Sequence, residues 1–195
     1  MKTFAFDIDK TVAAVAYLAR KKAAGRISIF LLLKMLYAAE RHALSEWHRP
    51  ITGDGFSSLP KGPILSRTYN LIKGEVLQTN SDAVKWAKFI SPRDGNFVQI
   101  IAEPDFDYLS QRELEALDSG FQEISALEEK YGNITEVLHQ KWPEWKDPEK
   151  TCGKRSMSLE VKDILSEFLG DEDEVQRVSL EIESVQSAKA ALQTS

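Results

Sequence analysis

Apolar residues recur every three or four positions along most of this chain, which is the pattern of helices with one buried face. The strongest example lies between Ser28 and Trp47. Its first part, up to Leu36, is apolar nearly all round, and such a helix needs neighbours on several sides. We therefore expect this helix to lie at the centre of the fold.

Helical spacing continues in the rest of the chain. Ser110 is a good N-cap, Glu113 three residues later completes a capping box, and Gly132 ends the helix that they start. With the central helix included, the spacing predicts helices at 9–25, 28–47, 63–74, 82–90, 110–132, from 135 onwards and at 158–169.

Two stretches are typical of strands. Phe97–Ala102 reads FVQIIA, and Phe56–Leu59 is its natural partner. The sequence thus predicts a mostly α (α+β) fold, a single helical domain of five to seven helices with a small antiparallel β-sheet or hairpin. We place this domain at residues 1–169. Residues 170–195 form an acidic C-terminal tail, which we expect to be helical or partly disordered.

Charge is unevenly distributed along the chain, whose formal net charge is −5. Residues 10–50 contain eight basic and two acidic side chains, whereas residues 103–149 contain four basic and thirteen acidic ones. Such asymmetry favours a charged surface for a partner, although helices laced with ion pairs explain it equally well.

The remaining bulk properties predict a cytoplasmic protein. The composition, 43% apolar and 28% charged, is ordinary for a globular domain. Cys152 has no second cysteine to pair with, which fits a reducing compartment. The start of the chain does not read as a secretory leader. The apolar run at 27–36 is far shorter than the ~20 residues that span a bilayer, so we expect no membrane partner.

The segment FAFDIDKTVA carries an enzyme-like motif. Asp7, Asp9 and Thr11 have the spacing of haloacid-dehalogenase-type phosphohydrolases, in which the first Asp is the nucleophile and Mg²⁺ offsets phosphate charge. That fold needs a buried parallel strand and then alternating strands and helices, whereas here helix follows helix. Capping of a helix start explains the same residues, so a Mg-dependent phosphohydrolase is the less favoured alternative.

No other pattern points to chemistry. His42, His48 and His139 are scattered, so we predict no metal site, and we interpret His139 as a packed, hydrogen-bonded residue that closes the domain. A helix-turn-helix across Gly25 would offer a mostly apolar second helix, which cannot read base edges, so we predict no direct nucleic-acid partner. The sequence therefore predicts a protein that is not an enzyme, without catalytic residues or cofactor.

The stretch KMLYAAERHALSEWHRPITGDGFSSLPKGPILSRTYNLI resembles the SocA-like antitoxin family, also called the Panacea domain. The family pattern is a helix that ends in a basic and aromatic turn, a pITGd loop, a short strand, Gly-Pro and a helix with a Tyr. FDYLSQRELEALDSGFQEISALEEKYG and VLHQKWPEWK are similar to the second half of the family, and the resemblance covers about residues 4–148. The matching residues of the first half are Lys34, Leu36, Tyr37, His42, Pro50, Ile51, Thr52, Gly53, Asp54, Gly62, Pro63 and Tyr69.

This resemblance implies an antitoxin of a prokaryotic or phage toxin–antitoxin system, which neutralises a co-encoded protein toxin by direct binding. Two alternatives stay open, because one branch of the family is thought to hand its toxin to a protease, and phage-borne relatives leave other protein-binding roles. The implied partners are a cognate protein toxin and, as alternatives, a protease or a second copy of the chain in a homodimer.

A binding protein needs aromatic and Arg anchors at the centre of its interface. The end of the central helix and the loop after it supply such groups, and the prolines and glycines of that loop limit the entropy lost on docking. Asp54 would be a fixed acceptor and Trp86 an anchor between two lysines. The predicted partner-binding residues are Arg41, Trp47, His48, Arg49, Thr52, Asp54, Lys61 and Trp86.

The alternative is that residues 50–63 only turn the chain between two core helices, with Asp54 capping backbone amides. If the loop binds the partner, Arg49→Ala or Asp54→Ala weakens binding and leaves the melting temperature within a few degrees of wild type.

Overall fold

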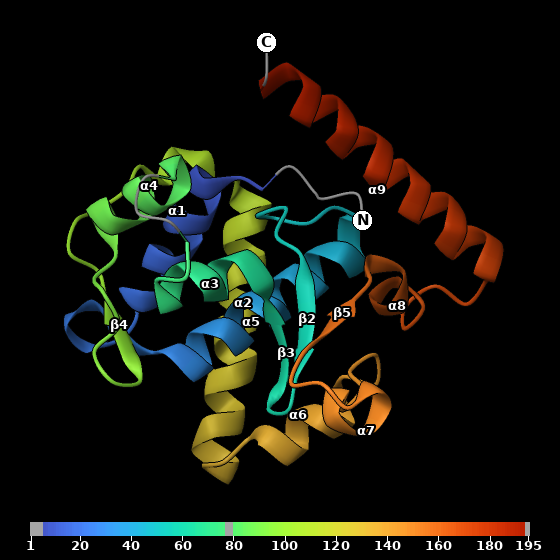
Figure 1. Ribbon diagram of the computed structural model, residues 1–195, viewed down its shortest axis with the longest axis horizontal. Coiled ribbons are helices and arrows are strands. Elements are labelled where there is room, and N and C mark those ends of the chain that lie inside the picture. Colours follow the sequence, from blue (N-terminus) through green and yellow to red (C-terminus); the bar gives the residue numbers. More distant parts are fainter. Residues whose placement is uncertain (1–5, 77–79, 194–195) are drawn as a thin grey trace.

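Helix α2 (Ile29–Trp47) forms the centre of the fold, as the apolar pattern predicts (Figure 1). The computed structural model describes residues 6–76 and 80–193. Helices α1 (Ile8–Ala19) and α5 (Gln111–Tyr131) pack along one side of α2, and a small sheet packs on the other. This arrangement buries α2 on several sides, which explains why its first half is apolar all round.

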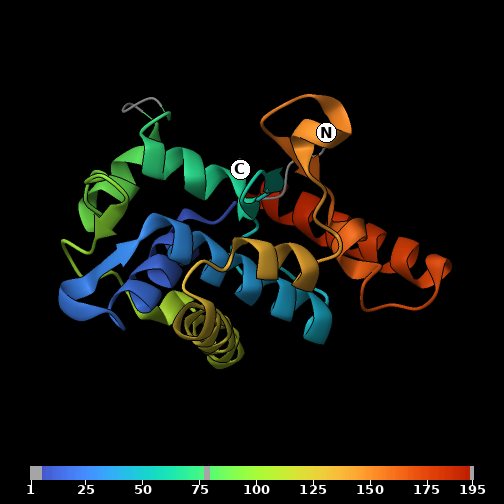
Figure 2. The same cartoon turned by 90° about the horizontal axis from the view of Figure 1, so that it is seen from below.

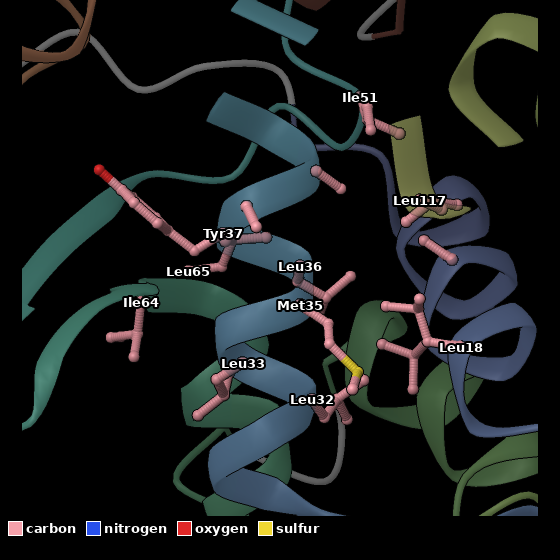
Figure 3. Close-up of a cluster of buried hydrophobic side chains, with 14 of the residues drawn as sticks. Leu18, Leu32, Leu33, Met35, Leu36, Tyr37, Ile51, Ile64, Leu65 and Leu117 are labelled. Carbon is pink, nitrogen blue, oxygen red and sulfur yellow. The ribbon is translucent and has the colours of Figure 1, made fainter. Parts of the chain in front are cut away.

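The core side chains of α2 join these two layers. Figure 3 shows Leu18 of α1 and Leu117 of α5 on one side of α2, with Ile64 and Leu65 of the sheet on the other. Three of these four side chains are fully buried, and Ile64 is 4% exposed. The hydrophobic core is therefore a single cluster built around α2.

Two small sheets complete the core, and every strand pair in the described residues is antiparallel. The three-stranded sheet has the order β3-β2-β5 and the two-stranded sheet the order β1-β4. The strands are β1 (Arg26–Ser28), β2 (Phe56–Leu59), β3 (Gly62–Leu65), β4 (Phe97–Gln99) and β5 (Met157–Leu159).

The predicted pairing of Phe56–Leu59 with Phe97–Ala102 is wrong. β2 forms a hairpin with β3, in which Phe56 lies opposite Leu65, and it also pairs with β5. The turn between β2 and β3 is tight because Gly62 adopts a positive φ of 97°, and closing such a short loop costs little entropy. β4 pairs instead with β1, just before α2.

The mostly α fold with a small antiparallel β component is confirmed. The described residues form nine α-helices, more than the sequence predicts, because α7 begins in a segment expected to be irregular and the tail forms α9. None of the described helices is long and apolar enough to cross a membrane. The remaining helices are α3 (Ser66–Lys73), α4 (Ser81–Phe89), α6 (Thr135–Lys141), α7 (Pro148–Cys152), α8 (Val161–Leu165) and α9 (Glu172–Gln193).

The predicted helix at 158–169 divides into β5 and the short α8. Residues 157–159 add an edge strand to β2, and Glu160 then caps α8 in a capping box with Asp163. α9 follows and lies at the outside of the molecule, with its first turns beside α8 (Figures 1 and 2). The boundary that we place after residue 169 stays a prediction.

Candidate binding site

The loop that follows α2 is anchored by a buried carboxylate. Glu40 accepts hydrogen bonds from the backbone amides of Ile51 at 2.6 Å and Thr52 at 2.9 Å, and from the Thr52 hydroxyl. Burial raises the pKa of the Glu40 carboxyl to about 7, although the donated hydrogen bonds oppose that shift. The start of the loop is thus fixed to the middle of α2.

Asp54 fixes the other part of the loop. Its carboxylate accepts from the amides of Arg67 and Thr68, both at 2.8 Å, and from the Thr68 hydroxyl at 2.7 Å. These are the capping contacts of the alternative interpretation, and they satisfy the free amides at the start of α3. Thr52 and Asp54 are each 1% exposed, so both predicted contact residues lie beneath the surface of this conformation.

We expect Asp54→Ala to lower the free energy of unfolding by about 2 kcal/mol, the upper end of the loss for a helix cap. This replaces the expectation from sequence that the substitution leaves stability unchanged. Chemical denaturation followed by circular dichroism measures the change. Asp94→Ala is the control, because that carboxylate is exposed and its ion pair in the described residues is with the exposed Arg26. Equal stability of the two variants would contradict the capping role.

Trp47, His48 and Arg49 lie together at the end of α2, where they line a cleft of about 420 Å³. His48 ends the helix in a left-handed conformation with φ of 56°. The opposite walls come from Lys10 of α1, from Arg112 at the start of α5, and from α9. We call the surface formed by Lys10, Trp47, His48, Arg49 and Arg112 the basic groove.

The charges of the basic groove are only partly neutralised. Lys10 forms an ion pair with Glu113. The Arg112 guanidinium carbon lies 5.1 Å from the centre of the Trp47 ring, a cation–π contact. Among the side chains that the structure describes, no carboxylate lies within 4 Å of the guanidinium of Arg112 or Arg49, and both residues are exposed. The groove therefore offers two free guanidinium groups beside a half-buried tryptophan.

Arg41 lies outside the basic groove. It forms an ion pair with the buried Glu144 at 2.8 Å, and Glu144 also accepts from the Tyr37 hydroxyl at 2.8 Å. The Arg41 guanidinium carbon lies 4.5 Å from the ring centre of Phe168. Arg41 thus joins α2 to two later segments of the chain, and its contacts are internal.

Lys61 lies in a second cleft, of about 710 Å³, at the tip of the β2–β3 hairpin. Lys34 lies at its floor, 1% exposed, and donates to the carbonyl of Pro63 at 2.8 Å. Burial lowers the pKa of Lys34 to about 7. Nearby, the His139 ring stacks on Trp145 at 3.6 Å, so His139 is packed as predicted, but its Nε2 has no hydrogen-bond partner among the described residues.

We expect Lys34 to make stability rise with pH. Between pH 7 and 10.5 the unfolded chain keeps a proton that the folded chain has lost, so each pH unit adds up to about 1.4 kcal/mol. Urea unfolding of wild type at pH 7, 8 and 9 should show this slope, and Lys34→Met should remove it. Lys61→Met, an exposed change on the same hairpin, should leave the slope intact. An unchanged slope in Lys34→Met would contradict the buried lysine.

Trp86 is also buried, at 5% exposure, and packs in the core from α4. An ion pair between Lys85 of α4 and Asp9 of α1, at 2.7 Å, also joins these two helices. The prediction of an exposed anchor between two lysines therefore does not fit the position of this side chain. Of the eight predicted contact residues, the structure brings three together in the basic groove: Trp47, His48 and Arg49.

The sequence interpretation missed the residues that complete the groove. Lys10 and Arg112 come from distant elements, and the only sequence signal for Arg112 is its place in the first turn of a helix with a clear capping box. It also missed Glu40, because a single Glu in a long helix usually lies on the solvated face.

The enzyme-like motif has structural roles in this fold. Asp7 caps α1 by accepting from the amide of Lys10 at 3.0 Å, and Asp9 pairs with Lys85. The sheets have two and three strands in the described residues, all antiparallel, and a phosphohydrolase of the proposed type needs a larger parallel sheet. No group of three His, Cys, Asp or Glu side chains that could hold a metal occurs in the described part of the chain.

Comparison with known proteins gives one match. The family model described as "Antitoxin SocA-like, Panacea domain" matches residues 32–146. This range contains α2 from its second turn onwards, the anchored loop and α5, and so includes every residue of the basic groove except Lys10. Neither a curated protein nor a solved structure matches the chain.

Proposed function

Because the chain belongs to the SocA-like antitoxin family, which is defined by the Panacea domain, we propose that it neutralises a co-encoded protein toxin by binding the toxin directly. The family match carries this proposal. It also supports a role in binding rather than catalysis. The exposed, unpaired thiol of Cys152 agrees with a cytoplasmic location, which we propose as well.

We further propose that the toxin docks at the basic groove. Tryptophan and arginine are among the residues most enriched at the energetic centres of protein interfaces, and the groove presents Trp47 together with Arg49 and Arg112. The loop beneath it is held by Glu40 and Asp54, so little entropy is lost when a partner binds. Free guanidinium groups would also steer an acidic partner towards this face.

The neighbouring reading frame provides the test. Its product should stop growth when expressed alone, and co-expression of this chain should restore growth. The two purified proteins should also elute as one complex. If the toxin is stabilised in the complex, direct neutralisation is supported. If the toxin disappears only when a cellular protease is present, the adaptor alternative is favoured instead. Failure to bind any neighbouring product would contradict the antitoxin assignment.

We expect Arg49→Ala with Arg112→Ala to weaken toxin binding at least ten-fold, mainly through faster dissociation, with little change in stability. Isothermal titration at two salt concentrations checks this, because the effect should shrink in high salt. Lys146→Ala is the control, since Lys146 is exposed and lies outside the groove. Equal affinity of all three proteins would place the toxin elsewhere.

A further inference from the structure

Helix α9 covers one side of the basic groove, although it lies outside the matched range 32–146. Its inner face is an aliphatic stripe of Val175, Val178 and Ile182, at three- and four-residue spacing, and these side chains are 8%, 3% and 4% exposed. Leu180, on the outer face, is 54% exposed. The described side chains of α9 are therefore buried along one face of the helix, which lies at the outside of the fold (Figure 2).

The contact of α9 with the body of the protein is almost purely apolar. Among the α9 side chains that the structure describes, none forms a hydrogen bond or ion pair with another element. The one ion pair of α9 there, between Arg177 and Glu174, is internal to the helix. Elements held by few contacts open more readily than the core, so α9 can leave the groove while the rest stays folded.

The charges of α9 complement those of the groove. Its first turn, which lies beside α8, contains Glu172, Asp173 and Glu174, and Glu181 lines the groove next to the aliphatic stripe. The groove offers Arg49 and Arg112, which have no carboxylate partner in the described part of the chain. An acidic helix with an aliphatic stripe is thus opposite in charge to this surface, and the chain itself contains one.

We propose that α9 is a built-in competitor, and that the toxin inserts an acidic amphipathic helix into the basic groove after displacing α9. This deepens the proposed function and rests on it. A tethered helix has a high effective concentration at its own groove. The apparent affinity for a competing helix is then the intrinsic affinity multiplied by the fraction of molecules in which α9 is undocked. A toxin helix with stronger anchors would overcome that competition, whereas weakly matching acidic proteins would not.

A peptide in place of the toxin tests this directly. The probe is a fluorescein-labelled peptide of residues 171–193, the acidic helix itself, titrated into the full-length protein. Val178→Ser with Ile182→Ser releases α9, and this variant should bind the peptide at least ten-fold more tightly than wild type. Leu180→Ser, a matched change on the outer face, should bind as wild type does. Adding Arg49→Ala and Arg112→Ala to the released variant should weaken binding at least ten-fold, and so should Glu181→Lys in the peptide.

Hydrogen exchange of wild type provides a second measurement that needs no variant. Excess peptide, made with heavy isotopes so that its mass differs, should speed exchange in α9 and slow it around Trp47. If neither the released variant nor wild type binds the peptide, α9 is a structural helix and the proposal is wrong. If light scattering shows that wild type forms dimers and that Val178→Ser with Ile182→Ser abolishes them, α9 docks in the groove of a second copy, and the proposal of a competitor within one chain is wrong. Because the assay contains no toxin, its failure is distinguishable from a failure of toxin neutralisation.

Discussion

Gly120→Ala is expected to lower the free energy of unfolding by about 3 kcal/mol, the upper end of the cost of overpacking. α5 crosses α2 at this glycine. A Cβ atom there would lie 2.5 Å from the carbonyl oxygen of Met35 and 2.9 Å from the amide nitrogen of Ala39. Both are backbone atoms of the central helix, so no side chain can rotate away and the helices must separate.

The sign of this effect is diagnostic, because Gly to Ala in an ordinary helix stabilises by about 1 kcal/mol. Urea unfolding followed by tryptophan fluorescence measures the change. Gly170→Ala is the matched control, since a Cβ at Gly170 meets nothing within 4 Å, and it should be neutral or slightly stabilising. A Gly120→Ala protein as stable as wild type would show that α2 and α5 do not pack as closely as described.

The central helix could be predicted from sequence because its signal is local. The apolar positions between Ser28 and Trp47 fix a buried helix whatever surrounds it, and the capping box at Ser110 fixes the start of α5 in the same way. The partners of β2 could not be predicted. Its pairing with β5 joins segments about a hundred residues apart, and periodicity carries no information on which strands meet.

The candidate site could be predicted only as far as its residues are contiguous in sequence. Trp47, His48 and Arg49 follow one another at a helix end, so they share a surface in any fold that exposes that end. Arg112 joins them only through the packing of α5 against α2. The burial of Thr52 is likewise a tertiary effect, since it depends on a carboxylate twelve residues earlier that reaches back from α2.

That carboxylate, Glu40, gives the second large effect. We expect Glu40→Ala to cost about 3 kcal/mol at pH 5, because it leaves the buried amides of Ile51 and Thr52 without an acceptor, at about 1–3 kcal/mol each. Glu40→Ala should also loosen the loop under the basic groove and so weaken partner binding. Gly120→Ala should leave the affinity of the folded fraction unchanged, so a binding assay on folded protein distinguishes the two variants. Glu46→Ala, on the exposed face of the same helix, should change neither property.

The cost of Glu40→Ala should shrink as pH rises. The pKa of Glu40 is raised from 4.5 to about 7 in the folded protein, so between these values the folded state keeps a proton that the unfolded chain has lost. The stability that wild-type Glu40 contributes is therefore complete below pH 4.5 and declines as pH rises through 7, by up to about 1.4 kcal/mol per unit. Unfolding of both proteins at pH 5, 6.5 and 8 measures this decline. The difference in free energy of unfolding between wild type and Glu40→Ala could instead stay constant or grow with pH. The Glu40 carboxylate would then be ionised in the folded state throughout, and interactions stronger than its three hydrogen bonds would offset its burial.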